Sequence, residues 1–482
     1  MRFLTNKIKK IPYFSKLASL AKKNNIEVYL VGGALRDFII APKKNIFDFD
    51  FAVSKGASLI ARKFAKVTGG SYVVLDEENK SYRVVVKEKK QCFQYDFTAF
   101  RGKDISGDLL GRDYSVNALA VSVNLYPKAK LIDNCNALSD LKRKIIRTIS
   151  QKALKEDPLR IIRAFSLMSR YKFTIERETL RLISLNKTLI KSVAGERINE
   201  ELYKIFSAVN SYSALRLMSD TKVLDEIFPC IRSARGVYQG RYHHLDVWNH
   251  SLEALKKYEV MYTRKLMNNP GIFKYLNQEI IPGRSRNYIV KLASLLHDIG
   301  KPLAKKKKGK KTIFHTHEKI GRDLAEQLGS RLKLSFKETD TLKKYIFWHL
   351  RPGYLADRHT PSKRAVYRFF RDTQDEGVAV ILLSIGDWRA TRGPEIGQKK
   401  RIIHERILFK LTDSYFKDKA KLPIAKLVDG YDIMRKFSLR PSVLIGKILK
   451  SVKEEQALGK IKSRADAYNL AKKIITNSKK RG

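Results

Sequence analysis

The sequence predicts an α+β protein, in which a small mixed sheet with helices is followed by three helical regions. Residues 1–145 alternate short apolar strand segments with helical ones, and residues 146–238 have an almost wholly helical pattern. Residues 239–395 are also helical and hold all but one of the nine histidines, and residues 396–482 are helical and basic. A chain of 482 residues accommodates about two to four domains.

The charge balance predicts a polyanionic partner. Lys and Arg number 98 against 48 Asp and Glu, a formal net charge of +50, and a field of that sign attracts nucleic acid. A solvated basic surface without a partner is the alternative. The three cysteines, Cys92, Cys135 and Cys230, have neither disulfide-framework nor zinc-knuckle spacing, and the longest apolar run, 378–385, is too short to span a bilayer. We therefore expect a cytoplasmic protein that does not enter a membrane.

The first chemical signal is a glycine pair after a short strand. Residues 27–31 read EVYLV, and Gly32, Gly33 and Arg36 follow. Paired glycines at a strand-to-helix turn let backbone N–H groups approach an anion closely, and Arg36, one helical turn further on, supplies a guanidinium for a triphosphate. Because Gly-Gly turns are common, this signal is weak by itself.

Two aspartates on the next strand make the signal specific. Residues 47–53 read FDFDFAV, and because side chains alternate across a strand, Asp48 and Asp50 share one face while apolar residues fill the other. Neighbouring carboxylates repel each other unless a cation neutralises them, and Mg²⁺ prefers one or two carboxylates plus substrate phosphates. We therefore predict a magnesium-dependent phosphoryl-transfer site, with an exposed acidic edge strand as the alternative. Asp96, in the later strand segment 94–100, is a candidate third metal ligand or an ordinary edge residue.

Five motifs in order give the chain a resemblance to a known family. They are LVGGALRD (30–37), DFD (48–50), DLLGRDYSVNALA (108–120), EDPLRIIRAF (156–165) and ERINEEL (196–202). Together they resemble the class II tRNA nucleotidyltransferases and bacterial poly(A) polymerases over the N-terminal half of the chain. The resemblance implies a head with the nucleotidyltransferase fold, followed by a helical neck and body.

The same resemblance implies roles for individual residues. Asp48 and Asp50 would bind Mg²⁺ and catalyse transfer, and Asn117 would order the segment after the third motif's aspartate. The nucleotide would be bound by residues of four motifs, namely Gly32, Gly33, Arg36, Arg112, Asp113, Asp157, Arg160 and Arg163.

The segment EDPLRIIR is the candidate reader of the incoming base. Asp157 is a candidate N-cap ahead of Pro158, and Arg160 and Arg163 then lie one turn apart on one helix face. By the resemblance, Asp157 and Arg160 would present the acceptor and donor pattern of a complementary base edge. An ordinary capped helix with surface arginines is the alternative for this segment alone.

Departures from the family pattern bear on which nucleotides are added. Ser166 stands where the family often carries another arginine, and Gly111 replaces the first of two arginines before Asp113. Relatives that finish with A usually have a longer flexible loop where this chain has the short segment 101–107, which resembles members that add two C residues and leave the final A to a partner enzyme. Residues 73–86 lack the basic Gly-Arg-Arg stretch more usual in a poly(A) polymerase, which makes that alternative weaker.

A second chemical signal lies in the histidine-rich third region. His297 and Asp298 end an apolar helix, YIVKLASLLHDIGKP, with Gly300 as the stop signal. An adjacent His-Asp pair with an earlier histidine and a later aspartate resembles HD-type metal phosphohydrolases, and imidazole with carboxylate suits a transition metal. His315 lies in the same histidine-rich stretch but outside the predicted set. The predicted metal site consists of His250, His297, Asp298, His317, His349 and Asp387. The resemblance implies action on phosphate ends of RNA, and buried core histidines are the alternative.

The combined interpretation is a Mg²⁺-dependent enzyme that adds C, with or without a final A, to the 3′ end of tRNA from CTP and ATP. Its partners would be tRNA, the two nucleotides and, for a CC-adding enzyme, a separate A-adding enzyme. A metal phosphohydrolase with a head that only binds RNA is one rival, and a non-catalytic RNA-binding protein is another. The lysine run at 304–311 is expected to be a mobile loop, either in contact with RNA or solvated without a role. The expected domains are a nucleotidyltransferase head (1–145), a neck and RNA-binding body (146–238), an HD-type domain (239–395) and a basic helical region (396–482).

Overall fold

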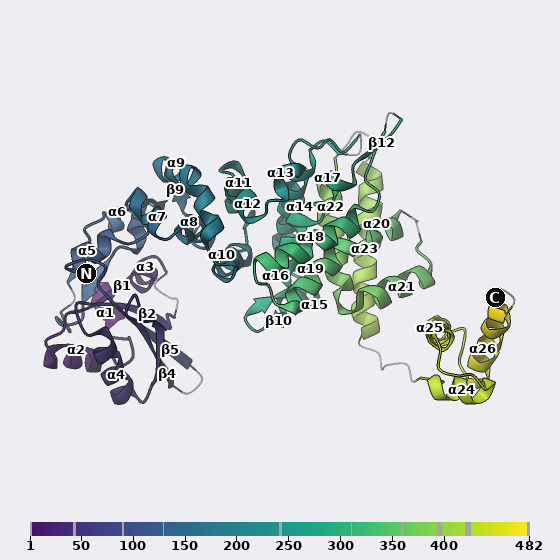
Figure 1. The fold of residues 1–482 in the computed structure, drawn as a ribbon, viewed down its shortest axis with the longest axis horizontal. Helices are drawn as coiled ribbons and strands as arrows, with labels where there is room; N and C mark the ends of the chain where they lie inside the picture. The colour runs from purple at the N-terminus through teal and green to yellow at the C-terminus, as the bar shows by residue number, and fades with distance from the viewer. Residues whose placement is uncertain are drawn as a thin grey trace. The chain divides into compact units, whose positions relative to one another are not determined.

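The fold is α+β, with a mixed sheet near the N-terminus and helices in the rest of the chain (Figure 1). Two compact units, Met1–Ile227 and Phe228–Gly482, make up the chain. This confirms the predicted fold class. The computed structural model describes residues 2–41, 45–88, 91–128, 130–240, 243–309, 311–357, 360–392, 398–419 and 426–479.

Among the described residues, seven strands form the main sheet in the order β3-β4-β5-β2-β1-β6-β7. β2 and β5 are parallel, and the other neighbouring pairs are antiparallel. The parallel pair places Asp50 opposite Asp96 and Asp48 opposite Gln94, so acidic side chains of two strands gather in the middle of the sheet. The strands are β1 (Val28–Val31), β2 (Asp48–Val53), β3 (Ser71–Asp76), β4 (Ser81–Glu88), β5 (Gln91–Ala99), β6 (Ala120–Ser122) and β7 (Leu131–Ile132).

Aromatic packing covers one face of this sheet. Helix α4 (Ala57–Thr68) packs there with α2 (Phe14–Lys23) alongside, and the ring centroid of Phe64 in α4 lies 5.7 Å from that of Phe97 on β5. The ring of Phe51 on β2 lies 5.2 Å from the same Phe97 ring. Because strand side chains alternate, burial of the β2 phenylalanines under these helices leaves the β2 aspartates on the opposite face. The other helices of this part are α1 (Arg2–Ile8), α3 (Gly33–Ile40), α5 (Ile105–Leu110) and α6 (Ala137–Arg143).

The neck is helical, as predicted, except for one pair of two-residue parallel strands, β8 (Ile145–Ile146) and β9 (Thr174–Ile175). The expectation that Asp157 caps a helix is wrong. Helix α8 begins at Leu159 with Pro158 at its N-cap, so Asp157 lies one residue too early and its side chain instead accepts hydrogen bonds from Arg197. The neck helices are α7 (Gln151–Glu156), α8 (Leu159–Tyr171), α9 (Arg177–Asn186), α10 (Gly195–Ser207), α11 (Tyr212–Asp220) and α12 (Val223–Ile227).

The second unit is built around the apolar helix α16, which ends at Leu296 with His297 at its C-cap, as the sequence predicts. Helices α14, α19 and α22 pack against α16. The helices of this part are α13 (Ile231–Ala234), α14 (Val247–Met261), α15 (Pro270–Asn277), α16 (Arg286–Leu296), α17 (Lys301–Ala304), α18 (His317–Arg331), α19 (Phe336–Trp348), α20 (Arg351–Ala356), α21 (Lys363–Thr373) and α22 (Gly377–Ala390).

Part of the lysine run forms regular secondary structure within the expected loop. Its residues enter two short antiparallel strands, β12 (Lys306–Lys308) and β13 (Lys311–Ile313), and a second hairpin pairs β10 (Glu279–Ile281) with β11 (Arg284–Ser285). The strand pairing satisfies the hydrogen-bonding capacity of the backbone groups while the lysines of β12 stay exposed.

The C-terminal part of the chain is helical. Its helices are α23 (Gln398–Lys419), α24 (Gly430–Phe437), α25 (Val443–Ala457) and α26 (Arg464–Lys479).

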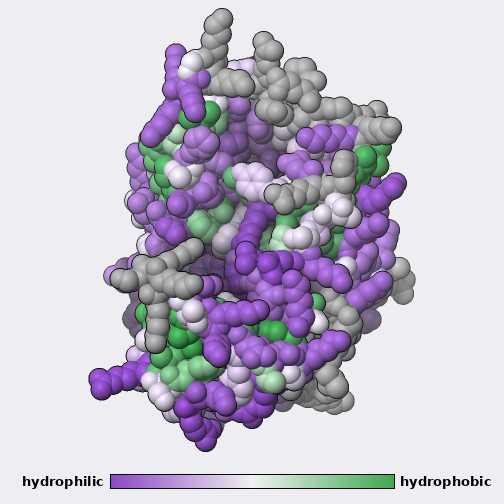
Figure 2. All heavy atoms as spheres, turned by 90° about the vertical axis from the view of Figure 1, so that its right-hand side faces the viewer, coloured by the Kyte–Doolittle hydropathy of each residue, from purple (hydrophilic) through white to green (hydrophobic). Residues whose placement is uncertain are grey.

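Hydrophilic side chains predominate on the face of the molecule drawn in Figure 2, and the apolar ones there gather in small patches. This agrees with the large excess of Lys and Arg in the sequence. No helix within the described ranges is both long and apolar enough to cross a membrane.

Candidate active site

The aspartates of β2 share one face of the sheet, as the alternating pattern predicts. Asp48 and Asp50 are exposed, whereas Phe49 and Phe51 between and after them are buried. The two carboxylates therefore stand on the side of the sheet that the aromatic layer leaves open.

Asp96 adds a third carboxylate beside this pair. It is the direct partner of Asp50 in the parallel ladder, and Arg83 donates two hydrogen bonds to its carboxylate, at 2.7 and 2.8 Å. Although part of Asp50 is exposed, the surrounding protein displaces water from its carboxylate, and this desolvation, followed by the charge of Asp96, raises the pKa of Asp50. A bound cation would stabilise the charged form of this desolvated carboxylate. The donor set therefore fits a divalent metal.

The glycine turn lies directly against these acids. Val31 pairs with Asp50, and Gly32 follows with φ of 75°, a conformation that favours glycine. A Cβ atom at Gly32 would lie 3.3 Å from Asp50 Oδ2 and 3.2 Å from Arg112 Nη1. Gly32 thus allows the turn, the Asp50 carboxylate and an arginine to approach one another.

Arg36 makes several hydrogen bonds within the protein, which a residue that only binds a triphosphate would not need. Its guanidinium donates to Asp37, with distances of 2.9 and 2.7 Å, and also to Asn117 and the Tyr171 hydroxyl. Most of its hydrogen-bonding capacity is therefore used within the protein. Asn117 orders this region, as expected, because it also donates to Asp113 at 3.1 Å.

Asp113 forms an ion pair with Arg163, the last of the four predicted nucleotide-binding arginines. Arg163 Nη2 lies 3.1 Å from Asp113 Oδ2, and the Tyr114 backbone N–H donates to Asp113 Oδ1 at 2.8 Å. Burial acts to raise the pKa of Asp113, but the charge of Arg163 and the hydrogen bonds outweigh it and lower this pKa. Arg112 is held separately by Asp108, at 2.8 Å.

A single pocket of about 200 Å³ collects the predicted nucleotide-binding residues. All eight line it together with Asp50 and Asn117, whereas Asp48 stands outside the lining. Within it, Arg160 is buried and donates to the Ala153 carbonyl at 3.1 Å, and Asp157 faces Arg197. The sequence motifs thus come together in space.

Four charged residues of this pocket were not predicted: Arg101, Arg170, Glu201 and Lys204. Arg101 donates to the Gly111 carbonyl at 3.2 Å, so a guanidinium lies beside the position where the family usually has its first arginine. Ser166 donates to Glu201, and Lys204 donates to the same carboxylate at 2.7 Å. The motif ERINEEL, which contains Glu201, was the available signal.

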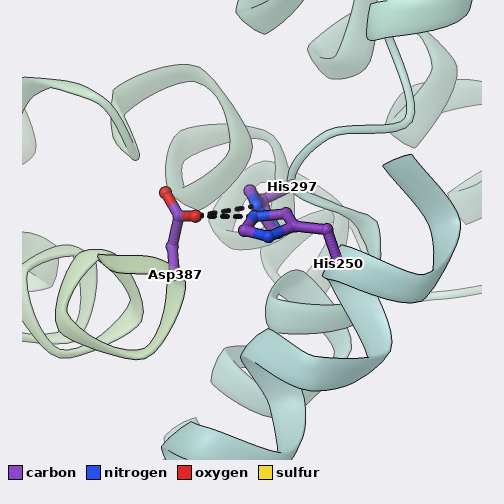
Figure 3. A group of neighbouring side chains, drawn as sticks. All are labelled: His250, His297 and Asp387. Carbon is purple, nitrogen blue, oxygen red and sulfur yellow. Dashed lines mark hydrogen bonds and ion pairs between the residues drawn. The ribbon is translucent and has the colours of Figure 1, made fainter. Parts of the chain in front are cut away.

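In the second unit, the six predicted HD residues form two neighbouring groups. One contains His250, His297 and Asp387, and Figure 3 shows both imidazoles directed at the aspartate. The distance from His250 Nε2 to Asp387 Oδ1 is 2.8 Å, and that from His297 Nε2 is 3.6 Å. The other group contains Asp298, His317 and His349, with both Nε2 atoms near Asp298 Oδ1, at 3.3 and 3.6 Å.

Three of the histidines are oriented by backbone carbonyl groups, within α16 for His297, within α19 for His349, and just before α18 for His317. The Nδ1 atoms of His297, His317 and His349 each lie within hydrogen-bond distance of the carbonyl three residues earlier, at 3.0, 2.8 and 2.6 Å. With Nδ1–H donating to that carbonyl, Nε2 carries its lone pair toward the cluster. His297 Nε2 and both Asp298 oxygens are buried and make no well-aligned hydrogen bond. Such a donor set fits a transition metal.

Gly300 positions the second group. A Cβ atom on this residue would lie 2.1 Å from the His317 carbonyl oxygen and 2.6 Å from the Gly321 nitrogen. Only glycine therefore lets the first turn of α18 approach the end of α16 and bring His317 to Asp298. Gly300, which the sequence indicates as the end of the helix, thus also allows this close packing.

Two residues next to the cluster were not predicted. Lys301 Nζ lies 2.6 Å from Asp298 Oδ2, and the His243 ring meets that of His250 edge-on. Burial, followed by the charge of Lys301, lowers the pKa of His243 to about 3, so this imidazole is neutral. His315, in contrast, is exposed and outside the cluster.

The first unit therefore has the architecture of a nucleotidyltransferase, because the acids, the glycine turn and the arginine-rich pocket lie together against a mixed sheet. The second has that of an HD-type helical domain. Residues 28–147 match the family described as "Poly A polymerase head domain", residues 172–235 the "Probable RNA and SrmB- binding site of polymerase A", and residues 247–469 the "HD domain".

Known proteins resemble the chain along nearly its whole length. It is 28% identical to an A-adding tRNA nucleotidyltransferase of Deinococcus radiodurans, over 90% of this chain and 92% of that one. It is 29% identical to a CC-adding tRNA nucleotidyltransferase of Geobacter sulfurreducens, over 96% of each chain. The structure of a Thermotoga maritima CCA-adding enzyme complexed with tRNA shares the fold, with a TM-score of 0.62, 18% identity and coverage of 96% and 94%. Separate regions of the chain thus match the poly(A) polymerase head, its RNA-binding region and the HD domain, and over nearly its whole length the chain is similar to tRNA nucleotidyltransferases.

Proposed function

We propose that this enzyme adds C residues from CTP to the 3′ end of tRNA and that Asp48 and Asp50 hold the catalytic Mg²⁺. The observation that carries this proposal is the shared face of the two aspartates beside the Gly32 turn, with the predicted nucleotide-binding residues in one adjoining pocket. Asp96 is the candidate third ligand.

The reaction requires positioning and charge stabilisation rather than a covalent enzyme intermediate. The terminal 3′-oxygen bonds to the α-phosphorus, the bond to the β-phosphate breaks and pyrophosphate leaves. Bound Mg²⁺ would supply activation of the 3′-hydroxyl and neutralisation of the triphosphate. Arg112 and Arg163 would attract the triphosphate, and Asp157 with Arg160 would select the base. Arg197 orients Asp157 for this role through hydrogen bonds of 3.1 Å to each of its carboxylate oxygens.

The product favoured by the structure ends in CC. Strand β5 ends at Ala99 and helix α5 already begins at Ile105, where Asp104 accepts a hydrogen bond from the Gly107 N–H at 2.8 Å. This connection is too short for the flexible loop that A-adding relatives usually have. A separate enzyme would then add the final A.

The nucleotide assay that tests this proposal uses tRNA lacking its CCA end, given CTP alone, ATP alone or both, followed by sequencing of the product ends. We expect CC from CTP alone and from the mixture, and little addition from ATP. Completion to CCA would replace the CC-adding proposal by a CCA-adding one, and long A tails from ATP alone would favour a poly(A) polymerase. Absence of any addition would contradict the proposed function.

A second activity is favoured by the convergence of six metal-type residues in the second unit. We propose that this cluster binds a transition metal and hydrolyses phosphoesters: a water oxygen bonds to phosphorus, the ester P–O bond breaks and the alcohol leaves with a proton. Elemental analysis of the purified protein and of His297→Ala tests the metal, and release of p-nitrophenol from p-nitrophenyl phosphate tests hydrolysis. Equal metal content in both proteins would contradict this site.

A further inference from the structure

A pocket of about 210 Å³ adjoins the histidine-aspartate cluster. Its lining includes Asp298, His349 and Asp387 of the cluster, together with Trp388 and His404. The last two residues lie outside the predicted metal site. His404 also lies beyond the histidine-rich third region, on α23.

Trp388 and His404 form a stacked pair. Their ring centroids are 4.1 Å apart, and their planes are inclined by only 16°. His404 is 2% exposed, and Trp388 directly follows Asp387 in α22. Stacking on a neighbouring ring fixes the orientation of both side chains, so their polar atoms have defined directions.

Part of the hydrogen-bonding capacity of this pair is not used by the described residues. Trp388 Nε1 and both ring nitrogens of His404 are buried and make no well-aligned hydrogen bond to the described residues. Burial lowers the pKa of His404, although a hydrogen bond with the Gly353 backbone acts to raise it, so this contact takes up one of the two ring nitrogens. Buried polar groups without partners are unfavourable, and a ligand that pairs with them recovers this cost.

We propose that Trp388 and His404 recognise the alcohol part of a phosphoester whose phosphate lies at the cluster, and that they favour an alcohol rich in hydroxyl groups, such as a sugar. The Trp388 N–H donates, and the ring nitrogen of His404 that the Gly353 backbone does not take up pairs with a second group, which matches hydroxyl groups that both donate and accept. Lys301 lines the same pocket and attracts the phosphate.

The size of the pocket agrees with this ligand class. Its volume of about 210 Å³ is smaller than the roughly 300–1,000 Å³ of sites for drug-sized ligands. A sugar phosphate suits it better than a larger molecule held entirely inside. The proposal rests on the proposed hydrolase function of the cluster, and its test must therefore separate recognition from hydrolysis.

Kinetics of the full-length, Mn²⁺-loaded protein test the specificity. Ribose 5-phosphate carries hydroxyl groups on its alcohol part, whereas p-nitrophenyl phosphate carries none. In Trp388→Phe and in His404→Phe, the ratio of KM for ribose 5-phosphate to KM for p-nitrophenyl phosphate should rise about three- to tenfold, the effect of one lost hydrogen bond. His315→Phe, a substitution of an exposed histidine outside the pocket, should leave this ratio unchanged. An unchanged ratio in both pocket variants would overturn the proposal.

Calorimetric titration measures recognition without turnover. Wild-type protein with Mn²⁺ should bind a ribose phosphonate, which cannot be hydrolysed, about three- to tenfold more tightly than methylphosphonate, and the pocket variants should lose this preference. Equal affinities of the wild type for the two phosphonates would reject the pocket assignment. If the wild type hydrolyses neither ester, the hydrolase proposal fails, while the titration still decides whether the pocket recognises the sugar.

Discussion

Asp50 on β2 and Asp96 on β5 are direct partners in the parallel strand pair, and Asp96 is fixed by two hydrogen bonds from Arg83. Desolvation and the neighbouring Asp96 charge raise the pKa of Asp50, and a bound cation would relieve both effects. The two strands therefore build one acidic site.

Asp96→Asn should weaken the response to magnesium. The carboxamide removes one negative charge from the site, so we expect the Mg²⁺ concentration for half-maximal nucleotide addition to rise about tenfold. A magnesium titration of the initial rate measures this, with Asp76→Asn on the exposed strand β3 as the matched control. Since β5 lies inside the sheet, the edge-strand alternative is wrong, and a titration curve that does not move would show that Asp96 only pairs with Arg83.

Arg163→Lys tests the link between Asp113 and the nucleotide. Lysine keeps the charge but loses the planar guanidinium, which reaches Asp113 at 3.1 Å from a pocket-lining position. We expect KM for CTP to rise by about tenfold with a smaller change in kcat, because binding is affected more than the metal site. Steady-state kinetics with varied CTP measure both constants. A change in kcat alone would contradict this assignment.

Arg197→Ala tests whether the orientation of the Asp157 carboxylate matters for the proposed selection of the base. Arg197 contacts both oxygens of Asp157 at 3.1 Å, so its removal should let Asp157 rotate and should reduce the preference for CTP over UTP by about three- to tenfold. Competition between the two nucleotides, followed by sequencing, gives the preference directly. The matched control is Arg181→Ala, which removes a similar pair with Glu178 on an exposed helix face. Equal effects of the two variants would contradict a role in base selection.

Gly300→Ala tests the packing that forms the HD cluster. The added methyl group would stand 2.1 Å from the His317 carbonyl oxygen, so α18 must move away from Asp298. We expect loss of bound transition metal and a free energy of unfolding lower by roughly 1–3 kcal/mol. Elemental analysis and chemical denaturation measure the two effects. Gly446→Ala, where a Cβ atom meets nothing within 4 Å, is the control, and normal metal content in Gly300→Ala would refute the packing argument.

Local sequence patterns predicted those site residues whose positions follow from the alternation of side chains along a strand or from the end of a helix. The shared face of Asp48 and Asp50 follows from a period of two, and His297 with Asp298 follows from the end of an apolar helix. The convergence of the remaining motifs was expected by resemblance to the family, and no local rule predicts it.

Long-range packing explains what sequence reasoning missed. Glu201 reaches the first pocket because α10 packs on α8, and His404 reaches the second because α23 packs on α22. Neither contact leaves a periodic signal in the sequence. The capping expectation for Asp157 failed because Pro158 itself occupies the N-cap, and the lysine run pairs into strands although its charges favour a loop.

The role of the β2 aspartates is tested most directly by nucleotide addition with Asp48→Ala. The assay supplies Mg²⁺, CTP and a tRNA lacking its CCA end, and filter binding measures the affinity for tRNA in parallel. We expect the rate of addition to fall at least about a hundredfold, with tRNA binding changed less than about twofold, since one exposed acid is lost from a strongly basic protein. A variant that extends tRNA at the wild-type rate would contradict the assignment of catalysis to this strand.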